Sequence, residues 1–196
     1  MPYKVMEIIM ARSKINTAAT NDVSEAAGWI APLRRMHAFP AMSAADARKE
    51  ARRIGETGEL AFRAFLVSRG FSVVDFSDIE PADAGIMLGK RCVRFQVKTV
   101  AACRDGYYHS TFQRGFGGSA KGVFEYSAGD YDVGVTAIPA ASTFVFHTDQ
   151  AKKSFRVHER DLPALRRSQR DRIFLALIEI GALDRDDIEQ ISTPYP

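Results

Sequence analysis

The chain has 196 residues, of which 46% are hydrophobic and 26% are charged. These proportions are typical of a folded domain and exclude a chain that is disordered throughout. The 27 basic residues barely exceed the 24 acidic ones, which excludes a polybasic, histone-like protein. The longest uninterrupted apolar run covers only residues 173–178, so no membrane partner is expected.

The cysteine and histidine content points away from secretion and from zinc. Cys92 and Cys103 form neither a CxxC motif nor a disulfide framework, and the four histidines are scattered without ligand spacing. No apolar stretch of signal-peptide length follows Met1. A reducing, cytoplasmic location is therefore expected.

Changes in the residue pattern along the sequence indicate three regions. Residues 1–42 show no pattern that assigns a secondary structure, and they are interpreted as an N-terminal extension, either an arm or an interface. Residues 43–150 hold the expected core, and residues 151–196 are expected to form a helical region packed on that core, with an acidic tail. The basic excess lies early in the chain, where residues 1–122 include 18 basic and 12 acidic side chains.

The predicted elements of the core alternate between helix and strand. Ser43 and Asp46 resemble a capping box, and a helix is predicted from there to about Arg69. Short β-branched or apolar runs follow, and Gly89-Lys90 suits a two-residue hairpin turn. The strands are predicted at residues 71–75, 84–88, 91–99, 131–138 and 143–147, with another starting at Tyr107. This order predicts an α/β domain of two or three layers.

The hairpin turn sets a register that brings three polar residues together. If Gly89 and Lys90 form the loop, Leu88 faces Arg91 and Asp83 lies opposite Gln96. Side chains alternate along a strand, so Lys98 points to the same face as Gln96 and Asp83. The simpler alternative is a surface ion pair between Asp83 and Lys98, with Gln96 solvated.

Glu59 is unusual because it falls on the apolar face of the predicted helix. It precedes Phe62 by three residues and Leu66 by seven, and that face is expected to be buried. A carboxylate there is costly unless it is paired or bound to a cation. The alternatives are a position at the rim of the core or a structural pairing with Lys98.

Several of these stretches together resemble the PD-(D/E)xK nuclease superfamily. They are residues 54–74 with their Gly-x-x-Gly-Glu start, then Asp83, then residues 95–99 (Phe-Gln-Val-Lys-Thr), and finally residues 129–136. The sequence looks nearest to archaeal-type Holliday junction resolvases and group I intron homing endonucleases, some of which have Gln-x-Lys. The resemblance implies a restriction-endonuclease-like core, in which a central mixed β-sheet is flanked by helices.

The resemblance also implies roles for residues at matching positions. Glu59, Asp83, Gln96 and Lys98 would be catalytic, and Glu59, Asp83 and Gln96 would hold Mg²⁺, with Mn²⁺ expected to substitute. Gln96 stands where an acidic residue is commoner, so one negative charge is lost and metal affinity should fall.

DNA contacts are expected from basic and aromatic side chains. Arg52 and Arg53 lie on the helix before Glu59, and a solvated helix face is the equal alternative for them. Tyr107, Arg114 and Lys121 belong to a Gly- and aromatic-rich stretch in which rings would stack on bases and cations would reach phosphates. Tyr108 and Phe112 in the same stretch are expected to be core residues instead.

Three functions follow. The favoured one is a Mg²⁺-dependent DNA endonuclease of restriction, homing or junction-resolving type. The alternatives are a catalytically impaired nuclease fold that still binds DNA, and an interaction domain that binds no nucleic acid. Since nucleases that make paired cuts are often two-fold dimers, a homodimer is an open alternative to a monomer.

Overall fold

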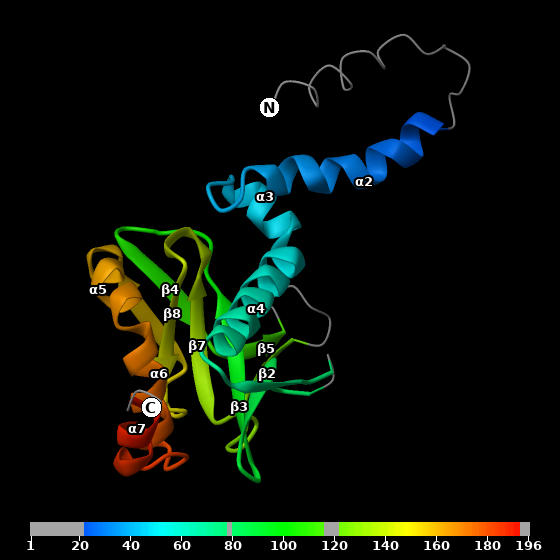
Figure 1. Cartoon of the computed structure of the whole chain (residues 1–196). Coiled ribbons are helices and arrows are strands. Elements are labelled where there is room, and N and C mark those ends of the chain that lie inside the picture. The colour runs from blue at the N-terminus through cyan, green and yellow to red at the C-terminus, as the bar shows by residue number, and fades with distance from the viewer. Residues whose placement is uncertain (1–21, 78–79, 116–121, 193–196) are drawn as a thin grey trace, which may run out of the picture. The chain divides into compact units, whose positions relative to one another are not determined.

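We describe the protein from a computed structural model, in which residues 22–77, 80–115 and 122–192 are placed (Figure 1). The chain divides into two compact units, Met1–Ala38 and Phe39–Pro196. In the first unit, helix α2 spans Asp22–His37 and contains Pro32, where the sequence analysis predicted only an extension. No described helix is long and apolar enough to cross a membrane.

The second unit is built around a five-stranded mixed sheet in the order β1-β2-β3-β7-β8. Strand β3 runs parallel to β7, and the other neighbours are antiparallel. The strands are β1 (Ser72–Asp75), β2 (Ala84–Leu88), β3 (Arg91–Thr99), β7 (Val133–Ile138) and β8 (Thr143–His147). All five coincide closely with the predicted strands, and the predicted central mixed sheet flanked by helices is confirmed.

Helices cover one face of this sheet (Figure 1). Helix α4 packs Phe62 and Leu66 against β3 and its neighbours, and helix α6 adds Ile173 and Leu177 to the same apolar core. The helices of the second unit are α3 (Ala44–Lys49), α4 (Ala51–Ser68), α5 (Leu162–Arg167), α6 (Gln169–Glu179) and α7 (Arg185–Ser192), with 3-10 turns at Pro139–Ala141 and Glu159–Asp161.

The predicted helix from residue 43 to 69 is in fact two helices. Ser43 caps the first by accepting a hydrogen bond from the Asp46 N–H, as the sequence indicated. The helix is then interrupted at Glu50, whose side chain is 1% exposed and accepts a hydrogen bond from Arg53. Its spacing of three and four residues from Leu66 and Phe65 would place Arg69 on the apolar face of α4, but Arg69 is exposed and lies over the Phe65 ring.

A two-stranded ribbon covers much of the other face of the sheet. It pairs β4 (Tyr107–Thr111) with β9 (Ser154–His158), which lies inside the region expected to be helical. Ser110 bonds to Thr136 of the sheet, and Phe112 packs against Phe155 and Tyr131. Tyr108 and Phe112 are buried, as predicted. A smaller ribbon pairs β5 (Gln113–Gly115) with β6 (Val123–Glu125).

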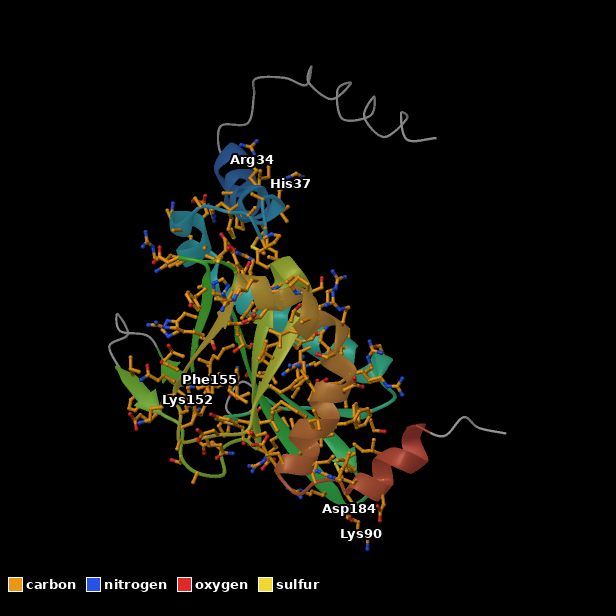
Figure 2. All side chains as sticks on the ribbon, turned by 90° about the vertical axis from the view of Figure 1, so that its left-hand side faces the viewer. Arg34, His37, Lys90, Lys152, Phe155 and Asp184 are labelled. Carbon is orange, nitrogen blue, oxygen red and sulfur yellow. The ribbon has the colours of Figure 1, made fainter. Side chains whose placement is uncertain are left out.

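The turn between β2 and β3 has the predicted geometry. Gly89 has φ +60° while Lys90 does not have positive φ, and Leu88 faces Arg91. Lys90 in this turn and Asp184 near α7 lie at the same end of the second unit (Figure 2). Arg91 bonds there to the carbonyl oxygens of Ile180 and Gly181. The residues that follow α6 are therefore bonded to the β2–β3 hairpin at its turn, the end that lies away from Asp83.

Candidate active site

The candidate site lies where β3 extends beyond its neighbour β2. Strand β2 begins at Ala84, opposite Phe95, so residues 96–99 pair with β7 alone. A cavity of about 400 Å³ opens at this point. Its walls include the four residues that the sequence resemblance marks as catalytic, Glu59, Asp83, Gln96 and Lys98.

Asp83 occupies the edge of β3 that β2 leaves unpaired. Its carboxylate oxygen Oδ2 accepts hydrogen bonds from the Val97 backbone N–H at 2.6 Å and from Gln96 Nε2 at 2.5 Å. Burial raises the pKa of the Asp83 carboxyl, although the Val97 N–H and the charges of Lys98 and Arg63 oppose that rise. The predicted hairpin register is thus confirmed as far as Ala84 and Phe95, and the Asp83 and Gln96 side chains meet just beyond it.

Lys98 reaches the same cavity from β3. Its Nζ donates a hydrogen bond to the hydroxyl of Tyr126 at 3.1 Å. Burial lowers the pKa of the Lys98 ammonium, while the negative charges of Asp83 and Glu59 act in the opposite direction. The Lys98 ammonium therefore lies beside carboxylates and is partly shielded from water. Catalytic cations are commonly placed in such an environment.

Tyr126 is a site residue that the sequence analysis missed. It follows strand β6, and its ring packs edge-on against Tyr131 with centroids 5.2 Å apart. Burial raises the pKa of its phenol, with the Asp83 charge acting in the same direction, so the hydroxyl stays protonated at neutral pH. No local pattern around residue 126 indicates this contact, because it joins two segments separated by a ribbon.

Glu59 enters the cavity because α4 lies unusually close to β3. Gly58 is buried against Thr99, and a Cβ on Gly58 would overlap the Thr99 hydroxyl. Thr99 also donates a hydrogen bond to the Gly55 carbonyl oxygen at 3.2 Å. The close approach at Gly55 and Gly58 therefore brings Glu59, which is half-buried, to the cavity wall.

Arg63, one turn after Glu59, fastens the start of the hairpin to α4. Its Nη2 donates to the Asp83 carbonyl oxygen at 2.8 Å, and its Nε lies 3.1 Å from Asp75 Oδ1. The guanidinium thus joins the end of β1 to the residue before β2. This positioning role was also missed, although an arginine four residues after Glu59 falls on the same helix face.

The predicted DNA-binding residues are distributed over different surfaces. Arg114 lines the cavity itself, and Tyr107 is 40% exposed beside a second, larger hollow. Arg52 and Arg53 are exposed in the first turn of α4 and line neither hollow, with Arg53 bonded to Glu50. Lys121 lies outside the described residues.

The side chains that line the cavity include the oxygen ligands that a hard cation prefers, but the number of such ligands is small. Glu59, Glu80, Asp83 and Gln96 all line it and offer carboxylate or amide oxygens, the ligands that Mg²⁺ prefers. The half-buried Asp83 carboxylate would also be stabilised by a cation. Within the described part of the chain, however, no three His, Cys, Asp or Glu side chains converge closely enough to hold a metal.

Comparison with known proteins found no matching family model and no similar curated protein. Solved structures are similar at low sequence identity, and two of them are described here. One is the bacterial homing endonuclease I-Ssp6803I, with 15% identity, a TM-score of 0.47, and coverage of 54% of this chain and 76% of that one. The other is the Holliday junction resolvase Hjc of Archaeoglobus fulgidus, with 19% identity, a TM-score of 0.28, and coverage of 52% and 91%. By name, the first is a homing endonuclease and the second a Holliday junction resolvase.

Proposed function

We propose that this protein is a Mg²⁺-dependent DNA endonuclease that hydrolyses phosphodiester bonds at the cavity beside β3. One observation carries the proposal. Asp83 and Gln96 bond to each other, and Lys98 is half-buried beside Asp83, in a cavity whose wall also includes Glu59. Two carboxylates, an amide and a lysine that line one cavity are typical of a site that hydrolyses a phosphate ester, and they favour this interpretation over a surface ion pair.

Each side chain has a distinct part in the proposed reaction. Asp83 and Gln96 would hold the metal ion, together with Glu59 from α4. When bound there, Mg²⁺ supplies polarisation of the scissile phosphate and a more acidic water. Lys98 places a positive charge beside the phosphate, where negative charge develops during hydrolysis, and Tyr126 keeps that ammonium inside the cavity.

A second candidate function is DNA binding without efficient cleavage. It is favoured by Gln96, whose amide donates to Asp83 where a carboxylate would add a second negative charge. The two candidates differ in what they predict for the wild-type protein in Mg²⁺: the first predicts cleavage, and the second predicts only retention of DNA.

Cleavage of linear, nicked, flapped and four-way DNA in Mg²⁺, Mn²⁺ and EDTA tests the proposal. Asp83→Asn and Lys98→Met should each lower the cleavage rate by about a hundredfold or more, as loss of metal or charge stabilisation does. Lys90→Met is the matched control, because Lys90 lies in the turn at the other end of the same hairpin. DNA binding with no cleavage of any substrate in either metal would contradict a nuclease function.

A further inference from the structure

A second hollow of about 930 Å³ lies next to the candidate site. Residues of α3 and the start of α4 form one wall, and the outer face of the β4–β9 ribbon forms the other. The segment 99–105 runs between them. Thr99 lines both this hollow and the catalytic cavity, so the two adjoin at the end of β3.

The rim of this hollow gathers positive charge from distant parts of the sequence. Arg48 comes from α3, Arg104 precedes β4, and Arg156 lies on β9; all three are exposed. None of them forms an ion pair with another residue in the described part of the chain. The one carboxylate among the lining residues is Asp105. Guanidinium groups brought together in this way repel one another unless an anion lies between them.

The ribbon presents rings and cations on the same outer face. His109 faces Arg156 in the antiparallel register, and both are exposed, whereas Tyr108 and Ser110 on either side of His109 are buried. Tyr107 is on the outer face too and packs edge-on against His158, 4.7 Å between centroids. The floor is apolar and includes Ile54 and Val100. Sugars and bases fit an apolar floor, and phosphates fit a rim of arginines.

We propose that this hollow binds the DNA strand on one side of the cleaved bond, with the strand leaving the catalytic cavity past Thr99. The inference rests on the proposed function, because it takes the scissile phosphate to lie beside Asp83. Its new content is the set of contacts: the guanidinium groups of Arg104 and Arg156 bind phosphates flanking the cut, and Tyr107 and His109 contact the nucleosides between them.

The test is binding of a fluorescein-labelled duplex, and of its labelled single strand, followed by anisotropy in EDTA so that nothing is cleaved. The double variant Arg104→Gln/Arg156→Gln should weaken binding about tenfold or more, and should lower the slope of log Kd against log salt by roughly two. The control is Arg167→Gln/Arg170→Gln, which removes two exposed arginines from α5 and α6, outside both hollows. Circular dichroism checks that both variants are folded.

The outcomes separate this inference from the nuclease proposal. Equal affinity and equal salt dependence of the two double variants would overturn the binding role of the hollow, whatever the cleavage assay shows. Wild-type protein that binds DNA and cleaves none would contradict the nuclease function, while a selective loss of binding in Arg104→Gln/Arg156→Gln would still support the strand contact. Wild-type protein that binds neither probe would overturn the binding role of the hollow, and the cleavage assay alone would then decide the nuclease function. Stronger loss on the single strand than on the duplex would assign the hollow to unpaired DNA.

Discussion

The ammonium group of Lys98 donates a hydrogen bond to the hydroxyl of Tyr126 at 3.1 Å, and it lies 5.4 Å from the centre of the same ring. The two residues come from β3 and from the segment after β6, and strands β4, β5 and β6 separate them in the chain. Tyr126 is in turn fixed by its edge-on contact with Tyr131. The position of the proposed catalytic lysine is therefore set by a tyrosine outside the hairpin that carries it.

Tyr126→Phe should slow cleavage without weakening DNA binding. The ring and its packing remain, but the hydrogen bond to the charged lysine is lost, and such bonds contribute roughly 1.5–3 kcal/mol. A tenfold or larger fall in the single-turnover rate is expected, with Kd for DNA unchanged. Tyr108→Phe removes the hydroxyl of a buried tyrosine that does not line the cavity and should leave the rate as it is. Equal rates for Tyr126→Phe and wild type would show that the hydroxyl does not position Lys98.

Gln96 should govern metal affinity in both directions. Gln96→Glu places a second carboxylate within hydrogen-bond distance of Asp83 Oδ2, so the metal-free protein should be less stable at pH 7 and Mg²⁺ should restore the loss. The Mg²⁺ concentration for half-maximal cleavage should fall by about tenfold, because an added negative ligand strengthens binding.

Gln96→Met is the matched neutral variant and should raise that Mg²⁺ concentration instead. The measurements are Mg²⁺ titrations of cleavage, and thermal unfolding in EDTA and in Mg²⁺. If Gln96→Glu unfolds at the same temperature in both solutions, residue 96 does not share a metal with Asp83.

The central hairpin could be predicted because its determinants are local. Gly89-Lys90 specifies a two-residue turn, and strand alternation then places Asp83 opposite Gln96 without knowledge of the rest of the chain. The β4–β9 ribbon could not be predicted in this way. A strand was expected to start at Tyr107 and is found at Tyr107–Thr111, but its partner lies more than forty residues later at Ser154–His158, and no local signal specifies that pairing.

The same reasoning explains the errors within helices and at the site. The helix break at Glu50 depends on burial of that side chain beside Arg53, which no local propensity reveals. Tyr126 contacts Lys98 only after the ribbons are in place. Sequence spacing predicted the residues that share one hairpin or one helix face, and it missed those whose position depends on long-range pairing.

Two glycines of α4 should respond in opposite ways to alanine. At Gly58 a new Cβ would overlap the Thr99 hydroxyl and lie 2.9 Å from Thr99 Cβ, whereas at Gly55 the nearest atom is Glu59 Oε1, 3.9 Å away. Gly58→Ala should lower the free energy of unfolding by about 1–3 kcal/mol and slow cleavage, because α4 must move away from β3. Gly55→Ala should raise the free energy of unfolding by up to about 1 kcal/mol. Urea unfolding checks both, and similar losses in the two variants would contradict the close approach of α4 to β3.

His147 should make the fold sensitive to mild acid. Its Nε2 lies 2.8 Å from Thr136 Oγ1, and its ring stacks on Phe155 with centroids 3.7 Å apart. Burial, assisted by the charge of Lys152, lowers the pKa of His147 from 6.5 to about 4. Figure 2 shows Lys152 next to Phe155, over whose ring it lies at 5.2 Å.

Because the folded pKa is below the unfolded one, the unfolded chain binds the extra proton first as pH falls. Stability should therefore be complete above about pH 6.5 and decline toward pH 4, by an amount on the order of 3 kcal/mol. Urea unfolding at pH 7 and pH 4.5 measures the difference. His147→Gln should flatten this dependence, whereas His109→Gln, at an exposed position on the ribbon, should retain it. An unchanged pH dependence in His147→Gln would mean that another group causes the acid sensitivity.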